Sequence, residues 1–112
     1  MKRNADASAS ASAIDPMALA GAVSTAVDKL KLLANQDRLM LLCQLALGEM
    51  CVSELEGTLG IRQPTLSQQL GVLRSEGVVS TRREGKNIFY AIADQDLLEI
   101  VAVLHRLYCP KE

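Results

Sequence analysis

Hydrophobic residues recur at helical spacing along most of the chain. A first helix is predicted to begin at Asp15-Pro16, because aspartate can cap a helix and proline suits its first position, and to end near Ala34. A second helix is predicted from Asn35 to Gly48. This second helix is apolar on nearly every face, so we expect it to be buried at the centre of the domain.

Two shorter helices are predicted next. Ser53 is expected to cap the first, which ends at Gly60. The second is expected to begin near Pro64 and to end at Glu76, followed by Gly77 in the position that favours a left-handed residue. Its apolar residues recur at i, i+4 and i+7, which predicts one buried stripe made of Leu66, Leu70 and Leu73.

The pattern then changes to two β-rich runs, residues 78–83 and 87–92, with a glycine-containing turn at residues 84–86. These features predict a β-hairpin. A last helix is expected from Asp94 to about Tyr108, ahead of a proline that would stop it. Four helices, a hairpin and a helix, in that order, predict a mainly α fold with a β-hairpin wing: a winged helix-turn-helix.

Composition limits the class of protein. The 112 residues suffice for one small domain, and an Ala/Ser run predicts that residues 1–14 form a disordered tail before a domain at 15–112. The net charge of −1 excludes binding of polyanions through overall charge. Neither a membrane span nor a signal peptide is expected. Three cysteines, an odd number, favour free thiols in a reducing cytoplasm over a disulfide scaffold.

Two short helices joined by a turn predict a helix-turn-helix, whose second helix would enter the major groove of DNA. Side chains able to hydrogen-bond base edges occupy its N-terminal half: Gln63, Thr65, Ser67, Gln68 and Gln69. Residues 62–86 hold five basic residues against two acidic ones, a local charge of +3, and the basic side chains are those of Arg62, Arg74, Arg82, Arg83 and Lys86. A wing that contacts phosphates would use the last three. A solvated surface, or a winged helix that binds protein, remains the alternative.

The stretch RQPTLSQQLGVLRSEGVV, residues 62–79, resembles the recognition helix and first wing strand of winged-helix repressors of the ArsR family. The stretch LANQDRL, residues 33–39, resembles the start of that family's second helix, and the likeness extends over about residues 20–109. Many members have His where this chain has Gln69. The resemblance implies a cytoplasmic homodimer whose first and last helices form the interface. It also implies binding to an inverted repeat in double-stranded operator DNA, relieved by an inducer.

Cys43, in LLCQL, and Cys109, in HRLYC, resemble the paired cysteines of the sulfide- and persulfide-responsive branch of that family, the SqrR, BigR and HlyU type. The branch implies that inorganic or organic per- and polysulfides join the two thiols as a disulfide or polysulfide bridge. The oxidised dimer would then release its operator and derepress sulfur-handling genes. No cofactor is implied. Without the resemblance, two buried structural thiols would explain the same residues.

A metal- or metalloid-responsive repressor is the nearest competing interpretation. Metalloid-binding members have Cys-Val-Cys where this chain has Cys51-Val52-Ser53, so no three-thiolate site is expected and Cys51 is predicted to be a small, partly exposed residue. His105 is the only histidine, and the zinc pattern of the last helix is missing. Cys109-Pro110 is formally a haem-regulatory dipeptide, but such pairs are common by chance and a helix terminator explains this one. No catalytic arrangement or phosphate-binding loop indicates an enzyme.

Overall fold

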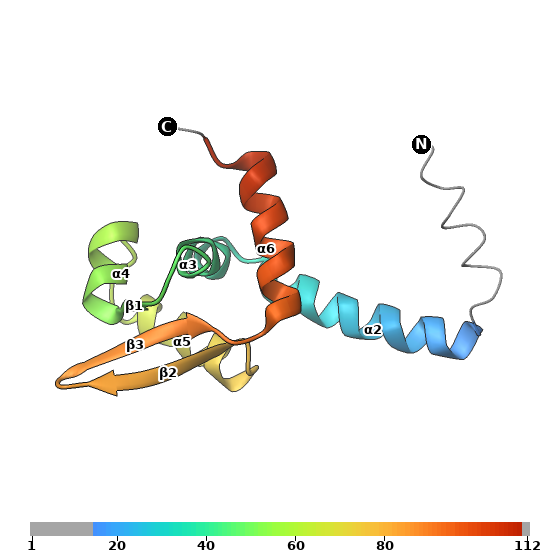
Figure 1. Cartoon of the computed structure of the whole chain (residues 1–112), viewed down its shortest axis with the longest axis horizontal. Helices are drawn as coiled ribbons and strands as arrows, with labels where there is room; N and C mark the ends of the chain where they lie inside the picture. Colours follow the sequence, from blue (N-terminus) through green and yellow to red (C-terminus); the bar gives the residue numbers. More distant parts are fainter. Residues whose placement is uncertain (1–14, 111–112) are drawn as a thin grey trace. The chain divides into compact units, whose positions relative to one another are not determined.

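The computed structural model describes residues 15–110, and the predicted tail at residues 1–14 lies outside them. The described residues form a mainly helical winged helix-turn-helix with five helices and a three-stranded antiparallel sheet (Figure 1). The described residues divide into two compact units, 15–31 and 32–110. The fold class expected from the sequence is confirmed.

Helix α2 (Pro16–Leu33) accounts for the described part of the first unit and ends at the start of the second. Its predicted cap is confirmed, because Asp15 Oδ2 accepts a hydrogen bond of 3.1 Å from the amide of Ala18. The apolar side chains along the helix are exposed: Met17, Leu19, Val23, Val27 and Leu30. The first unit therefore presents an apolar surface.

Helix α3 (Gln36–Leu45) lies at the centre of the second unit, in contact with three helices and strand β3. Asn35 caps it as predicted, and Leu41 is fully buried. The helix ends at Leu45 rather than at Gly48, however, and Leu47 beyond it is 69% exposed. The expected burial at the centre of the domain is therefore confirmed for the helix itself, in which Gln36 alone is exposed, and it fails only beyond Leu45.

Helix α4 (Val52–Leu59) begins two residues earlier than predicted, with Cys51 rather than Ser53 at its N-cap. The amide of Cys51 donates a hydrogen bond of 3.0 Å to Glu54 Oε1, which satisfies a backbone donor at the helix start. Cys51 is also buried, so the predicted partial exposure is wrong. The helix ends at Gly60, whose φ of +72° favours glycine.

Helix α5 (Thr65–Ser75) buries the predicted leucine stripe. A Schellman motif ends it: the amide of Gly77 donates to the carbonyl of Arg74 at 3.0 Å, and that of Val78 to Leu73 at 3.1 Å. Gly77 has a φ of +75°, and both Val78 and Leu73 are buried. The chain therefore leaves the helix and enters the wing with its backbone groups paired.

Strands β1 (Met50–Cys51), β2 (Val79–Glu84) and β3 (Asn87–Ile92) form a sheet in the order β1-β3-β2. The predicted hairpin is confirmed, but Glu84 pairs with Asn87, so the turn is the two residues Gly85-Lys86. Strand β1, which pairs with β3, was not predicted. Two residues are too few for a periodic pattern.

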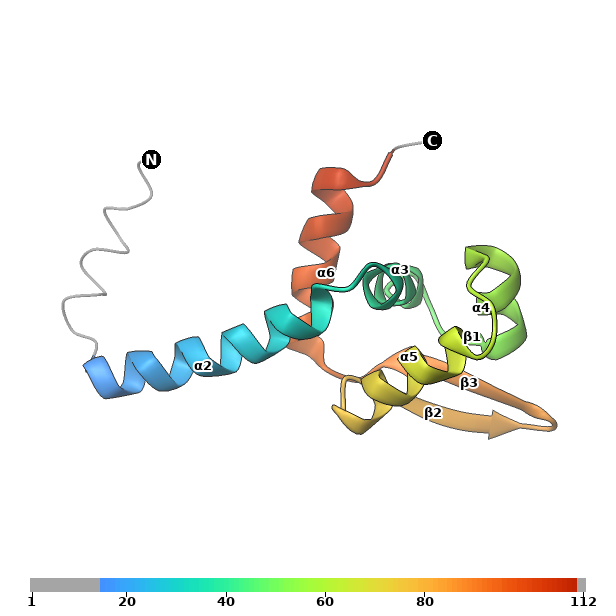
Figure 2. The ribbon, with the colours of Figure 1, turned by 180° about the vertical axis from the view of Figure 1, so that it is seen from behind.

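Helix α6 (Gln95–Tyr108) follows the sheet. Asp94 caps it as predicted, with Oδ1 accepting a hydrogen bond of 3.0 Å from Leu97. Leu97 and Val101 are fully buried, and α6 contacts α3 in the core (Figure 2). Among the described helices, none has the length and hydropathy needed to cross a membrane.

Candidate DNA-binding surface and thiol pair

Helix α4, the turn after Gly60 and helix α5 form the helix-turn-helix. Gln63 lies just before α5, and its Oε1 accepts hydrogen bonds from both the amide and the hydroxyl of Ser67. This contact orders the start of the helix and uses only the carbonyl end of the amide. Among the predicted DNA-contacting residues outside the wing, the structure exposes Arg62, Gln63, Ser67, Gln68 and Arg74 and half-buries Thr65 and Gln69.

Gln69 differs from the other predicted base readers, because a second helix holds it. Nη1 of Arg38, on α3, donates a hydrogen bond of 3.1 Å to Gln69 Oε1, while Nε of Arg38 donates to the carbonyl of Leu32 at 2.7 Å. This contact ties α5 to α3. The arginine therefore uses one lone pair of the carbonyl oxygen of Gln69, and the NH₂ group of Gln69 supplies the donors for base recognition.

Arg82 of the wing is paired within the protein. Its Nε lies 3.1 and 3.0 Å from the two carboxylate oxygens of Glu49, and its Nη1 donates to Glu84 at 2.9 Å. The guanidinium also stacks 4.6 Å from the ring centroid of Phe89. Hydrogen bonding by Arg82 lowers the pKa of Glu49, and the bond from Arg82 to Glu49 raises the pKa of the arginine. Two carboxylates thus pair with the positive charge of Arg82, a residue predicted to contact phosphate. Arg83 and Lys86, by contrast, are exposed at the end of the hairpin.

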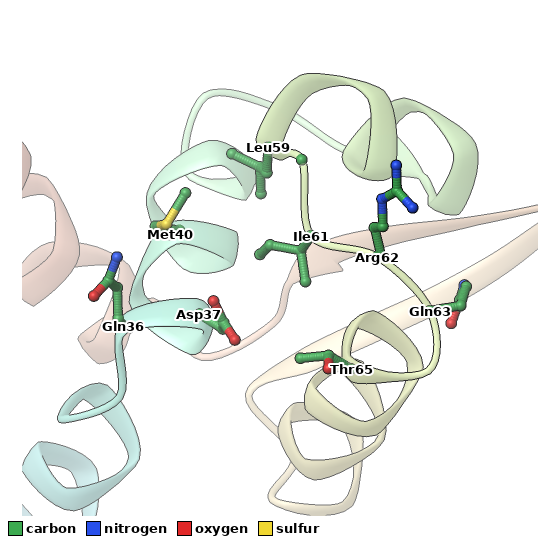
Figure 3. Close-up of a pocket in the computed structure, with 9 residues that line it drawn as sticks. Gln36, Asp37, Met40, Leu59, Ile61, Arg62, Gln63 and Thr65 are labelled. Atoms are coloured by element: carbon green, nitrogen blue, oxygen red, sulfur yellow. The ribbon is translucent and has the colours of Figure 1, made fainter.

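A polar pocket lies at the start of α5 (Figure 3). It has a volume of about 490 Å³ and is open to solvent between α3, the end of α4 and the turn. Figure 3 shows Asp37 and Met40 on the α3 side, with Arg62 and Gln63 on the opposite side. Residues predicted to contact DNA therefore form one border of this pocket.

The second group of candidate residues is a pair of thiols. Cys43 lies on α3 and Cys109 directly after α6, and both side chains line one pocket. Both are half-buried and reduced. Burial raises the pKa of Cys43, and the charge and hydrogen bond of Cys109 raise it further. Cys43 therefore stays protonated to a higher pH than an ordinary cysteine, which disfavours it as the first nucleophile.

This asymmetry predicts the order of alkylation. We expect iodoacetamide at pH 8 to label Cys109 before Cys43, as followed by quantitative mass spectrometry of the peptides. A Cys109→Ala variant removes two of the three causes of the raised pKa and keeps the burial. The pH profile of Cys43 labelling should therefore move to lower pH in that variant. Faster labelling of Cys43 in the unmodified protein would contradict the assignment.

The thiol pair opens into an apolar pocket of about 370 Å³. The pocket lies between α3, the end of α4 and the end of α6, and none of its lining residues is Asp, Glu, Lys or Arg. Besides the two cysteines, it is lined by Gln36, Leu39, Met40, Gln44, Leu47, Leu59 and His105. The structure thus brings together the two cysteines that the sequence analysis paired.

The third cysteine lies apart from this pocket. Cys51 is buried at the N-cap of α4, and its Sγ is 3.3 Å from the hydroxyl of Ser53. Within residues 15–110, no three His, Cys, Asp or Glu side chains lie close enough together to hold a metal ion.

The sequence did not predict the contacts that Glu49 and Arg38 make with the DNA-binding surface. Glu49 lies 33 positions before Arg82 in the sequence, and no local pattern indicates that they pair. Arg38 stood out only as part of the motif at the start of the second helix. Its contact with Gln69 depends on the packing of α3 against α5.

Comparison with known proteins agrees with this fold. Residues 35–81 match the family model described as bacterial regulatory protein, arsR family. The chain is 55% identical over 83 residues to the biofilm growth-associated repressor of Agrobacterium fabrum, which covers 74% of this chain and 71% of the relative. It is 43% identical over 84 residues to the transcriptional activator HlyU of Vibrio cholerae, covering 75% and 78% of the two chains.

A solved structure extends the likeness to the whole fold. The crystal structure of the transcriptional repressor BigR from Xylella fastidiosa superposes with a TM-score of 0.78 at 42% identity, covering 88% of this chain and 100% of that one. Identity at this level over most of both chains exceeds what a shared fold alone requires. The chain therefore belongs to the ArsR family of DNA-binding transcriptional regulators and is not an enzyme.

Proposed function

We propose that this regulator is a repressor whose hold on DNA is controlled by oxidation of Cys43 and Cys109. The observation that carries the proposal is that these two thiols line the same pocket, because Cys43 belongs to the central helix α3 and Cys109 to the end of α6. Similarity to proteins named as repressors in Agrobacterium fabrum and Xylella fastidiosa supports repression, rather than activation, as the result of DNA binding.

The inducer in this proposal is a per- or polysulfide. The Cys109 thiolate attacks the terminal sulfur of an inorganic polysulfide HSₙ⁻, forms Cys109–S–SH and releases the chain shortened by one sulfur. Cys43 then loses its proton, attacks the sulfur of Cys109 and expels HS⁻. The two thiols are oxidised to a disulfide, and the polysulfide is reduced to HSₙ₋₁⁻ and H₂S. If two sulfurs are transferred first, attack on the middle one leaves a trisulfide bridge.

The bridge acts by favouring one arrangement of the helices. Closing a loop of this length stabilises a cross-linked chain by about 4 kcal/mol, less any strain. A shift from 1:99 to 99:1 between DNA-binding and DNA-free forms needs about 5.5 kcal/mol of differential free energy. The entropy of loop closure is gained relative to the unfolded chain and is the same for both folded forms, so a link between α3 and the end of α6 acts only by straining the DNA-binding arrangement. Because α3 contacts α5, such strain can reach the recognition helix.

The DNA partner in this proposal is an inverted repeat read by a homodimer. Helix α5 enters the major groove with Gln68 and the NH₂ groups of Gln63 and Gln69 toward base edges, while Arg83 and Lys86 of the wing contact phosphates. Arg62, Thr65, Ser67 and Arg74 complete the surface, with Arg82 as a paired contributor. Two exposed apolar surfaces would supply the dimer contacts: the one on α2, and one on α6 that includes Val103, Leu107 and Tyr108.

Mass spectrometry of polysulfide-treated protein tests the switch. Treatment with disodium tetrasulfide should join the peptides containing Cys43 and Cys109, with no, one or two additional sulfur atoms between them. The same sample should lose affinity for its operator and recover it on reduction with dithiothreitol. Bridge formation without loss of affinity would overturn the proposal, as would an unmodified dithiol.

The Arg82–Glu49 pair yields a prediction about the wing. Glu49→Gln removes the carboxylate that makes most of the contact with Arg82, so more of the arginine's positive charge becomes available to phosphate. We expect tighter operator binding with a steeper salt dependence, by up to about one unit of slope per protomer. Fluorescence anisotropy at several salt concentrations measures it. Arg82→Gln in the same background should restore the shallower slope, and an unchanged slope for Glu49→Gln alone would exclude Arg82 as a phosphate contact.

A further inference from the structure

The pocket beside the thiol pair is lined mainly by apolar side chains, which favour an apolar ligand over a charged one. Leu39, Met40 and Leu59 line it, together with Leu47 beyond the end of α3. The polar side chains on the wall are two glutamines and a histidine, and acidic side chains, lysine and arginine are missing from it. An ionised group entering this space would lose hydration without gaining a counter-charge, whereas an apolar group would be favoured.

The volume of the pocket also exceeds what a short sulfur chain needs. At about 370 Å³ it falls in the range of pockets that hold small organic ligands. Cys43 and Cys109 both lie on its wall, so a molecule seated there has its substituent among the leucines and its sulfur atoms beside the thiols. The same space therefore can select an inducer and present it for reaction.

We propose that this pocket binds the uncharged, apolar substituent of an organic persulfide or polysulfide, and so sets the chemical class of the inducer. This inference rests on the proposed thiol switch. For an organic trisulfide R–S–S–S–R, the Cys109 thiolate attacks an outer sulfur to form Cys109–S–S–R and release the persulfide R–S–S⁻. Cys43 then loses its proton and attacks the Cys109 sulfur, which forms the disulfide and releases R–S⁻. The dithiol is oxidised by two electrons and the trisulfide is reduced.

Two trisulfides that differ in their substituents provide the test. Rates of thiol loss are measured with dipropyl trisulfide, which is neutral and apolar, and with glutathione trisulfide, which is charged. Each rate is divided by that of N-acetylcysteine with the same compound, which removes differences in intrinsic reactivity. We expect the corrected rate with dipropyl trisulfide to be higher by at least about tenfold. Equal corrected rates would overturn the pocket assignment.

Leu47→Lys is the matching variant, because this side chain lines the pocket and is exposed enough to be replaced without disturbing the core. The lysine should slow the reaction with dipropyl trisulfide and accelerate the reaction with the anionic glutathione trisulfide. The ratio of the two corrected rates should therefore fall by about tenfold. Val72→Lys, at an exposed apolar position on α5 away from the pocket, should keep the ratio. A ratio that Leu47→Lys leaves unchanged would contradict the proposal.

Disodium tetrasulfide separates failure of this inference from failure of the switch. It has no organic substituent, so it should bridge Cys43 and Cys109 in the unmodified protein whether or not the pocket selects. If it forms the bridge and the two trisulfides do not differ, the switch stands and the pocket assignment fails. If it does not form the bridge, the proposed function fails first and the pocket assignment with it.

Discussion

Replacing either Cys43 or Cys109 by serine is expected to leave a protein that binds its operator and no longer releases it on polysulfide treatment. The unmodified protein should lose affinity by at least about 100-fold under the same treatment, which corresponds to roughly 2.7 kcal/mol. The reason is that one remaining thiol can be persulfidated but cannot close a link between α3 and the end of α6. Fluorescence anisotropy with the operator, before and after treatment, measures both quantities.

Cys51→Ser is the matched control for this experiment. Cys51 is buried, does not line the pocket of the other two thiols, and occupies an N-cap, a position where serine is favourable. This variant should respond to polysulfide as the unmodified protein does. A variant with serine at Cys43 that still releases DNA on treatment would eliminate the bridge as the cause. An unresponsive Cys51→Ser would instead make the third cysteine a participant.

The second large effect concerns stability. Leu41→Ala should lower the free energy of unfolding by about 2–5 kcal/mol, because Leu41 is fully buried at the centre of the core and its removal leaves a cavity. This is a large part of the total stability of a small domain. Urea unfolding followed by circular dichroism measures the change, with the slope against urea concentration compared between the two proteins.

Leu47→Ala is the control, since it removes the same side chain from an exposed position six residues further along. We expect a change within about 0.5 kcal/mol. The hydrophobic pattern alone treats the two leucines alike, so the comparison tests where the buried face of α3 ends. A large loss of stability in Leu47→Ala would show that this face extends beyond the helix.

Local signals located most of the fold. Asp15, Asn35 and Asp94 all cap the helices that the sequence assigned to them, because the capping contact spans only three residues. Gly60 and Gly77 end their helices with positive φ for the same local reason. The family resemblance added the pairing of the two cysteines, which lie 66 positions apart and which periodicity could not connect.

Contacts between distant segments lay beyond the sequence pattern. Strand β1 exists because Met50 and Cys51 pair with Tyr90 and Phe89 of β3, and nothing within two residues indicates such a partner. The end of α3 was misplaced because Leu47 is apolar yet has no core to pack against. Likewise, the charge of Arg82 counted toward a basic surface, although tertiary packing brings Glu49 to neutralise it.

The two pockets of the second unit share three residues, Gln36, Met40 and Leu59, which Figure 3 shows in the wall of the polar pocket. A substitution at Met40 or Leu59 made to alter the choice of inducer would therefore also reshape the surface where the recognition helix begins. Leu39 and Leu47, by contrast, line the apolar pocket and not the polar one. Inducer preference can thus be redesigned without affecting operator preference only through residues that line the apolar pocket and not the polar one. Natural variation at the three shared positions should change both preferences together.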